Sequence, residues 1–115
     1  MRSSSIEIEL PIARSVVVTK GALQVALADG RSISVPLAWY PRLLHATSSE
    51  RRRWRLIGQG RGIHWEALDE DISIEGILAG RASGESRASF RKWLNSRAAR
   101  QASRPIPLRR KRRAR

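Results

Sequence analysis

The sequence contains no cysteine, which excludes disulfide bonds, thiolate metal ligands and a cysteine nucleophile. It also lacks any run of the roughly 20 apolar residues that a membrane-spanning helix needs. The charged residues Glu7, Glu9 and Arg14 interrupt the N-terminal segment, where a signal peptide would require an apolar stretch. We therefore expect a cytoplasmic protein.

Acidic residues are nearly absent from the C-terminal part of the chain. The 115 residues carry a net charge of +13, but residues 1–80 contain ten Lys or Arg and nine Asp or Glu, a balance of only +1. Residues 81–115 contain thirteen Lys or Arg and the single acid Glu85, a balance of +12. Only the C-terminal segment therefore requires a polyanion or an acidic partner to explain its charge.

Alternating apolar and polar residues, together with β-branched runs, predict a series of strands. Residues 5–28 are predicted to form two strands, with alternating SIEIEL at 5–10, β-branched SVVVT at 15–19, a turn at Lys20-Gly21 and the apolar ALQVALA at 22–28. The other predicted strands are SISVPL at 32–37, WRLI at 54–57 and GIHWEAL at 62–68. Asp29-Gly30 predicts a hairpin turn, because glycine accepts a positive φ without steric cost. Short turns of this kind favour an antiparallel sheet.

The glycines of GQGRG, at 58–62, allow two interpretations, a phosphate-binding loop or the turn of a hairpin. A dinucleotide-binding fingerprint needs a third glycine at its sixth position, where this chain has Ile63, and a helix should follow it. A P-loop would end in Gly-Lys-Ser or Gly-Lys-Thr, which is absent. The strand-like IHW that follows favours the hairpin turn.

Two short helices are predicted in the middle of the chain. PRLLHA, at 41–46, begins with a proline at the first helical position and should turn Leu43 and Leu44 inward. The spacing of Thr47 and Glu50 matches a capping box, which predicts a second helix over 48–54.

Residues 69–80, DEDISIEGILAG, predict an acidic turn and then a helix with Ser73 as its N-cap and a stop at Gly80. A further helix is predicted over 85–101, with Phe90, Trp93 and Leu94 on one face and basic residues around it. PIPLRRKRRAR, at 105–115, has no periodicity and predicts disorder.

These elements predict an α+β fold, a small antiparallel β-sheet with short helices packed on it, followed by a basic C-terminal helix and a disordered tail. The expected organisation is a domain at 1–80, a linker and basic amphipathic helix at 81–104, and the Arg-rich tail at 105–115.

No catalytic, cofactor-binding or metal-binding residue is predicted. His45 and His64 lie nineteen residues apart and show no paired ligand spacing, and no serine sits in a nucleophile-elbow motif. The acidic residues at 66–71 lack the EF-hand register. They are typical of a helix N-terminus, and a second interpretation makes them a docking patch for a basic segment.

The basic segment carries the strongest functional signal, because arginine binds phosphate through two hydrogen bonds and stacks on bases. The predicted nucleic-acid-binding residues are Arg91, Lys92, Arg97, Arg100, Arg109, Arg110, Lys111, Arg112 and Arg113. A disordered solubilising tail is the alternative interpretation. The predicted partner-binding residues are Trp39, Tyr40 and Trp65, of which we expect at least one in the core. The basic cluster ERRRWR, at 50–55, is interpreted as a solvated face.

The segment from Asp29 to Gly80 resembles the bacterial family called domain of unknown function (DUF) 2442. The similar elements are DGRSISVPL, YPRLLHA, WRLIGQGRGIHW and LDEDISIEGIL. The resemblance implies a small α+β domain in which the glycine stretch is a turn between strands. Some members carry a C-terminal helix-turn-helix-like region, and some are encoded beside a second small protein, similar to toxin–antitoxin modules. Residues 81–115 have room for one helix and a tail, so the helix-turn-helix role is not carried over.

The leading hypothesis is an antitoxin-like, non-enzymatic binding module that needs no cofactor. Its domain would bind a protein partner, and its basic segment would contact nucleic acid or an acidic surface. The second hypothesis is a metal-dependent hydrolase or nuclease that uses His64 with Glu66, Asp69 and Asp71. The third is a structural protein that self-associates when the tail of one copy docks on the acidic patch of another.

Overall fold

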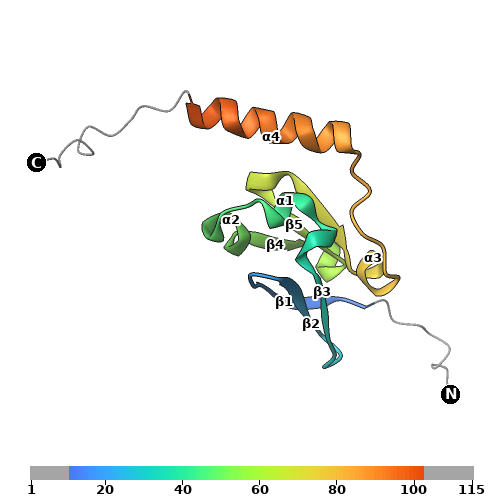
Figure 1. Ribbon diagram of the computed structural model, residues 1–115. Helices are drawn as coiled ribbons and strands as arrows, with labels where there is room; N and C mark the ends of the chain where they lie inside the picture. Colours follow the sequence, from blue (N-terminus) through green and yellow to red (C-terminus); the bar gives the residue numbers. More distant parts are fainter. Residues whose placement is uncertain (1–10, 103–115) are drawn as a thin grey trace, which may run out of the picture. The chain divides into compact units, whose positions relative to one another are not determined.

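The computed structural model describes residues 11–102, which divide into two compact units at the bond between Gly84 and Glu85. The first unit holds six strands and several short helices, and the second holds the single helix α4, Arg87–Ala102 (Figure 1). The predicted α+β class is confirmed. The predicted strand at 5–10 and the predicted disordered tail at 105–115 lie outside the described residues.

The first sheet is antiparallel, with the strand order β1-β2-β3. Its strands are β1 (Ala13–Val18), β2 (Ala22–Leu27) and β3 (Ser32–Pro36). Alternation places Val16, Leu23, Val25 and Val35 on the buried face. The predicted Asp29-Gly30 turn is confirmed, with Gly30 at φ 97° and a bond from the Arg31 amide to the Asp29 carboxylate at 3.0 Å.

A second antiparallel sheet has the order β4-β5-β6, so the predicted strands divide between two sheets. Its strands are β4 (Trp54–Ile57), β5 (Gly62–Trp65) and β6 (Glu70–Ser73). The prediction of an acidic turn over 69–73 is wrong for β6. Glu70 and Ile72 alternate with exposed Asp71, and all three pair with β5. The turn lies just before, in η4 (Glu66–Leu68) and at Asp69, which adopts a left-handed φ of 52°.

Short helices connect the two sheets and follow them. They are η2 (Leu37–Trp39), α1 (Pro41–Leu44), α2 (Ser48–Arg52) and α3 (Ile74–Leu78). The capping box is confirmed: the Glu50 amide donates to Thr47 Oγ1 at 3.1 Å, and the Thr47 amide donates to Glu50 Oε1 at 2.9 Å. Ser73 caps α3 by accepting from the Gly76 amide at 2.8 Å. The helices α1, α2 and α3 are each shorter than predicted.

Of the two leucines predicted to face inward from α1, only Leu43 does so. Leu43 is buried, whereas Leu44 is 40% exposed. Neighbouring positions of a helix point about 100° apart, so a single turn of four residues buries one of them and exposes the other. The interior prediction for Leu44 is therefore wrong.

The core of the first unit is formed by apolar side chains from both sheets and from the short helices. The largest fully buried side chains are Trp65, Leu23, Leu37, Leu43, Ile63, Leu68, Ile74 and Val25. Among the helices of residues 11–102, none has the length and apolar character of a membrane span.

The glycine stretch is confirmed as the turn between β4 and β5, in the form of η3 (Gly58–Gly60). Gly60 is buried and has a φ of 92°. A Cβ there would lie 3.1 Å from Ile12 Cβ and 3.2 Å from the Ala13 carbonyl oxygen. The turn thus packs against the chain just before β1, and close packing explains the glycine at this position.

We expect Gly60→Ala to destabilise the first unit by roughly 2–4 kcal/mol, since both the positive φ and the close contacts oppose a side chain. Gly30→Ala is the matched control, because Gly30 has a similar φ of 97° but nothing within 4 Å of an added Cβ. It should cost only about 1–2 kcal/mol. Denaturant unfolding measures both, and equal losses would contradict the packing role of Gly60.

Candidate functional site

A group of ionisable side chains lies across the exposed face of the second sheet, centred on His64. His64 occupies the middle strand β5 between Ile63 and Trp65, which both face the core. Alternation therefore turns His64 outward. The register places Arg55 of β4 opposite His64 on one side and Asp71 of β6 opposite it on the other.

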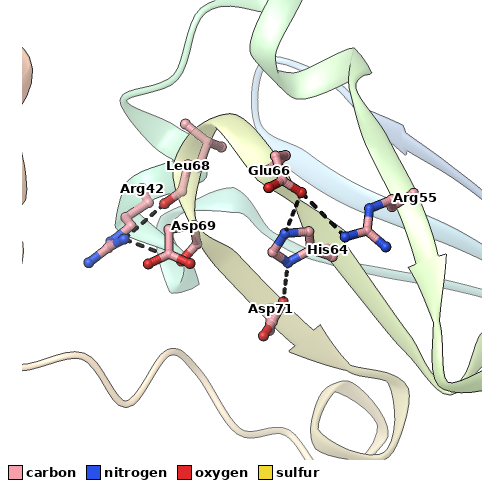
Figure 2. A network of polar contacts seen from close by, with 7 residues as sticks. All are labelled: Arg42, Arg55, His64, Glu66, Leu68, Asp69 and Asp71. Atoms are coloured by element: carbon pink, nitrogen blue, oxygen red, sulfur yellow. Dashed lines mark hydrogen bonds and ion pairs between the residues drawn. The ribbon is translucent and has the colours of Figure 1, made fainter.

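Both ring nitrogens of His64 contact a carboxylate (Figure 2). Nδ1 contacts Asp71 Oδ1, and Nε2 lies 3.1 Å from Glu66 Oε1. The same Glu66 oxygen accepts a bond of 3.3 Å from the Arg55 guanidinium. The His64 side chain is only 15% exposed, whereas its three partners are mostly exposed. We call these four residues the His64 cluster.

The carboxylates favour the protonated imidazole. The hydrogen bond to Asp71 is the main cause that raises the pKa of His64 above 6.5, and the charges of Asp71 and Glu66 add to it while partial burial opposes it. The hydrogen bond from Arg55, followed by that from His64, lowers the pKa of Glu66. When His64 is protonated, the cluster holds two positive and two negative charges and is balanced.

This geometry suits a structural cation rather than a general base. An imidazolium that donates from both nitrogens offers no lone pair for abstracting a proton. Asp69, the third carboxylate of the hydrolase hypothesis, lies apart from His64, where Arg42 NH1 donates to the Leu68 carbonyl at 2.8 Å and to the Asp69 carbonyl at 3.3 Å (Figure 2). Across residues 11–102, no group of three or more His, Asp or Glu is arranged to hold a metal ion.

Two of the three aromatic residues predicted to bind a partner are core residues. Tyr40 and Trp65 are buried, so a partner cannot reach their rings in this fold. The Tyr40 hydroxyl donates to the Arg81 carbonyl at 3.3 Å, and the Trp65 indole donates to the Arg51 carbonyl at 3.1 Å. A small domain needs large rings to fill its core, and their polar ends find backbone acceptors. Trp39 is half-buried.

The predicted nucleic-acid-binding residues divide between described and undescribed parts of the chain. Arg91, Lys92 and Arg100 are exposed on α4, and Arg97 is half-buried. Five cations and no carboxylate lie within the sixteen residues of α4. Arg109 to Arg113 lie outside the described residues.

The basic cluster at 50–55 does not act as one solvated face. Arg51 donates to the Leu43 carbonyl at 2.9 Å and to the Leu44 carbonyl at 2.8 Å, at the end of α1. Arg55 belongs to the His64 cluster. Arg52 instead lines a groove of about 540 Å³ beside β1. The groove is lined by Val16, Val17, Val18, Thr19, Lys20, Ser48, Arg51, Arg52 and Trp54, and we call it the β1 groove.

No motif in the sequence indicates the β1 groove, because its two sides lie about thirty residues apart along the chain. The basic run at 51–53 was the available signal, but a run of charges that Glu50 partly neutralises is typical of a solvated face. The second hypothesis grouped His64 with Glu66 and Asp71, and the structure brings both carboxylates to its ring. Arg55 was not in that group, because only the pairing of β4 with β5 places it opposite His64.

We expect His64 to titrate above 6.5 in the folded protein, and Asp71→Asn to lower its midpoint more than Glu66→Gln, since the bond to Asp71 is the largest cause. NMR of the imidazole protons measures both. His45, which bonds the Pro41 carbonyl within its own turn, serves as the internal control. A His64 midpoint at or below 6.5 would contradict this interpretation of the cluster.

The raised pKa of His64 also predicts a pH dependence of stability. The folded state holds the proton more tightly than the unfolded state, so the contribution is complete below 6.5 and is lost as the pH rises through the folded value. Asp71→Asn should therefore destabilise the protein more at about pH 6 than at about pH 9. Urea unfolding of both proteins at the two pH values measures this, and a pH-independent difference would refute it.

Two solved structures are similar to this chain. A crystal structure of a protein of unknown function from Rhodospirillum rubrum is 29% identical, with a TM-score of 0.58, and the match covers 68% of this chain and 94% of that one. The solution structure of an uncharacterized protein from Chromobacterium violaceum is 27% identical, with a TM-score of 0.55, and the match covers 75% of each chain. No curated protein matches significantly.

The model of the family described as protein of unknown function (DUF2442) matches residues 13–83, from the first residue of β1 to just before the end of the first unit. The chain is a member of the DUF2442 family.

Proposed function

We propose that this chain is a non-enzymatic binding protein that contacts nucleic acid through α4 and a protein partner through its DUF2442 domain. The observation that carries the proposal is the charge of α4. Its five cations, without a single carboxylate in the helix, make it a concentrated positive surface. Such a surface attracts phosphate backbones independently of their sequence.

The dimensions of α4 fit this role. A helix of sixteen residues spans about 24 Å, which is long enough to follow several successive phosphates along a duplex. The cations lie around the helix rather than on one stripe, which suits backbone contact better than base recognition from a groove.

The aromatic residues of α4 stabilise the helix and orient one of its cations. The rings of Phe90 and Trp93 stack with centroids 5.7 Å apart, and the Arg97 guanidinium lies 4.7 Å from the Trp93 ring centre. Pairs at these spacings lie on the same helix face and support the helix. A guanidinium can stack on a ring and also bind phosphate through its planar edge.

The domain contributes differently. Within it, several cations are held by the fold: Arg31 pairs with Asp29, Arg42 and Arg51 bond carbonyl groups, and Arg55 pairs with Glu66. Residues 1–80 are also nearly neutral, so the domain has little net attraction for phosphate. Its proposed ligand is therefore a protein, which in an antitoxin-like arrangement is a second small protein.

Neutralising the helix tests the nucleic-acid part. Arg91, Lys92, Arg97 and Arg100 are changed together to Gln, and fluorescence anisotropy measures binding to a duplex DNA at several salt concentrations. We expect weaker binding and a plot of log affinity against log salt that is shallower by roughly 3–4 units, because each phosphate contact contributes about 0.9.

The control changes Arg14, Arg53, Arg61 and Arg81 to Gln, which removes the same charge from exposed positions of the domain. It should leave the salt slope nearly unchanged. Equal losses in both quadruple variants would show that only net charge matters, and unchanged binding by the helix variant would refute the role of α4.

A further inference from the structure

The β1 groove runs along the edge of a sheet. Five consecutive residues of the chain, Val16 to Lys20, line one of its sides. Successive side chains of a strand point to opposite faces, so consecutive lining residues mean that the groove follows the edge of β1 and not one of its faces. In the described part of the chain, β1 has β2 on one side and no strand on the other.

Backbone groups on this edge are directed into the groove. The Thr19 amide donates to the Ala22 carbonyl at 2.9 Å. Val17, two residues before Thr19, lies opposite Gln24 of β2. Hydrogen-bonded and non-hydrogen-bonded pairs alternate along an antiparallel ladder. Val17 therefore bonds β2, whereas the amide and carbonyl groups of Val16 and Val18 point away from β2.

The opposite side of the groove is basic and partly aromatic. Arg51 and Arg52 come from α2, and Trp54 begins β4. Lys20 adds a cation to the first side, two residues beyond the end of β1. No carboxylate lines the groove. Arg51 is already bonded to the end of α1. Lys20 and Arg52 are both exposed and form no ion pair within residues 11–102, so they are the cations available to a ligand.

Apolar surface completes the groove. Val17 is 55% exposed and lies on the outer face of the first sheet. Trp54 is half-buried and presents part of its ring. An edge strand with apolar side chains is a template for pairing with another chain unless it is covered.

We propose that the β1 groove binds an extended acidic segment of a protein partner, which joins the first sheet as a fourth strand beside β1. Such strand addition takes its affinity from main-chain hydrogen bonds and its specificity from side chains at alternate positions. Val16 and Val18 supply the hydrogen bonds, and Lys20 and Arg52 select for carboxylates. The inference rests on the proposed partner-binding role of the domain and assigns that role to the β1 groove.

A polypeptide fits the groove better than a nucleic-acid strand does. The groups of Val16 and Val18 include carbonyl acceptors, which match the amides of a peptide but find no donor on a phosphate backbone. The two available cations would otherwise serve either ligand. The pattern of slowed amide exchange along β1 therefore distinguishes a bound peptide from a bound nucleic-acid strand.

The test selects a display library of random short peptides on the full chain. Counter-selection uses the full chain with Lys20→Glu and Arg52→Glu, which retains α4 and so removes peptides that bind the basic helix. We expect the selected peptides to be rich in Asp and Glu, alternating with β-branched residues. Their affinity for the Lys20→Glu, Arg52→Glu protein should fall by roughly tenfold or more, whereas Arg61→Glu with Arg81→Glu, the matched control, should leave it unchanged.

Amide exchange measured by NMR identifies the mode of binding. A bound peptide should slow exchange at Val16 and Val18 and leave Val17, whose amide already bonds β2, unaffected. Uniform protection, or none, would refute strand addition. A selection that yields no acidic peptides would overturn the proposal, and so would a fluorescent single-stranded oligonucleotide that protects the groove where peptides do not.

The variants of α4 keep this proposal separate from the preceding one. The quadruple α4 variant, in which Arg91, Lys92, Arg97 and Arg100 are changed to Gln, should still bind the selected peptides. If it loses DNA but keeps the peptides, both proposals stand. Loss of peptide binding in that protein would place the acidic ligand on α4 and refute the assignment to the β1 groove.

Discussion

The burial of Trp65 on the middle strand β5 is the constraint on which the second sheet depends. Its ring is fully buried, and its indole donates to the Arg51 carbonyl, which ties β5 to α2. A shift of one residue would expose the ring and leave the indole without its acceptor, at a cost of several kcal/mol. The position of Trp65 therefore determines that His64 points outward, and the pairing of the three strands then brings Arg55 and Asp71 beside it.

The same pairing explains why His64, a histidine between two carboxylates, stabilises the sheet here. On the outer face of a sheet, directly opposed charges interact across the strands and stabilise their register. The His64 cluster joins all three strands of the second sheet at one level. It adds to the apolar constraint from the opposite face, so the two faces of β5 specify the same register.

Charge is organised differently in the two units. In the domain, arginines serve the fold: Arg42 bonds the turn before β6, and Arg51 bonds the end of α1. Guanidinium groups suit this work because their planar arrangement of donors reaches two carbonyl groups at once. In α4 the cations have no carboxylates beside them within the helix. A count of arginines from the composition therefore overestimates how many of the domain's positive charges can contact a ligand.

Local patterns of the sequence determined the α+β class, the Asp29-Gly30 turn, the Thr47 and Ser73 caps, the glycine turn and the basic helix, because each depends on residues close together in the chain. Three features were decided by tertiary structure. Packing against β5 made a strand of the acidic segment at 70–73, since burial of Ile72 outweighed its turn-like composition. Competition for a small core took Tyr40 and Trp65 inward. The approach of α2 to β1 formed the β1 groove, and contacts between distant segments leave no local pattern from which to predict them.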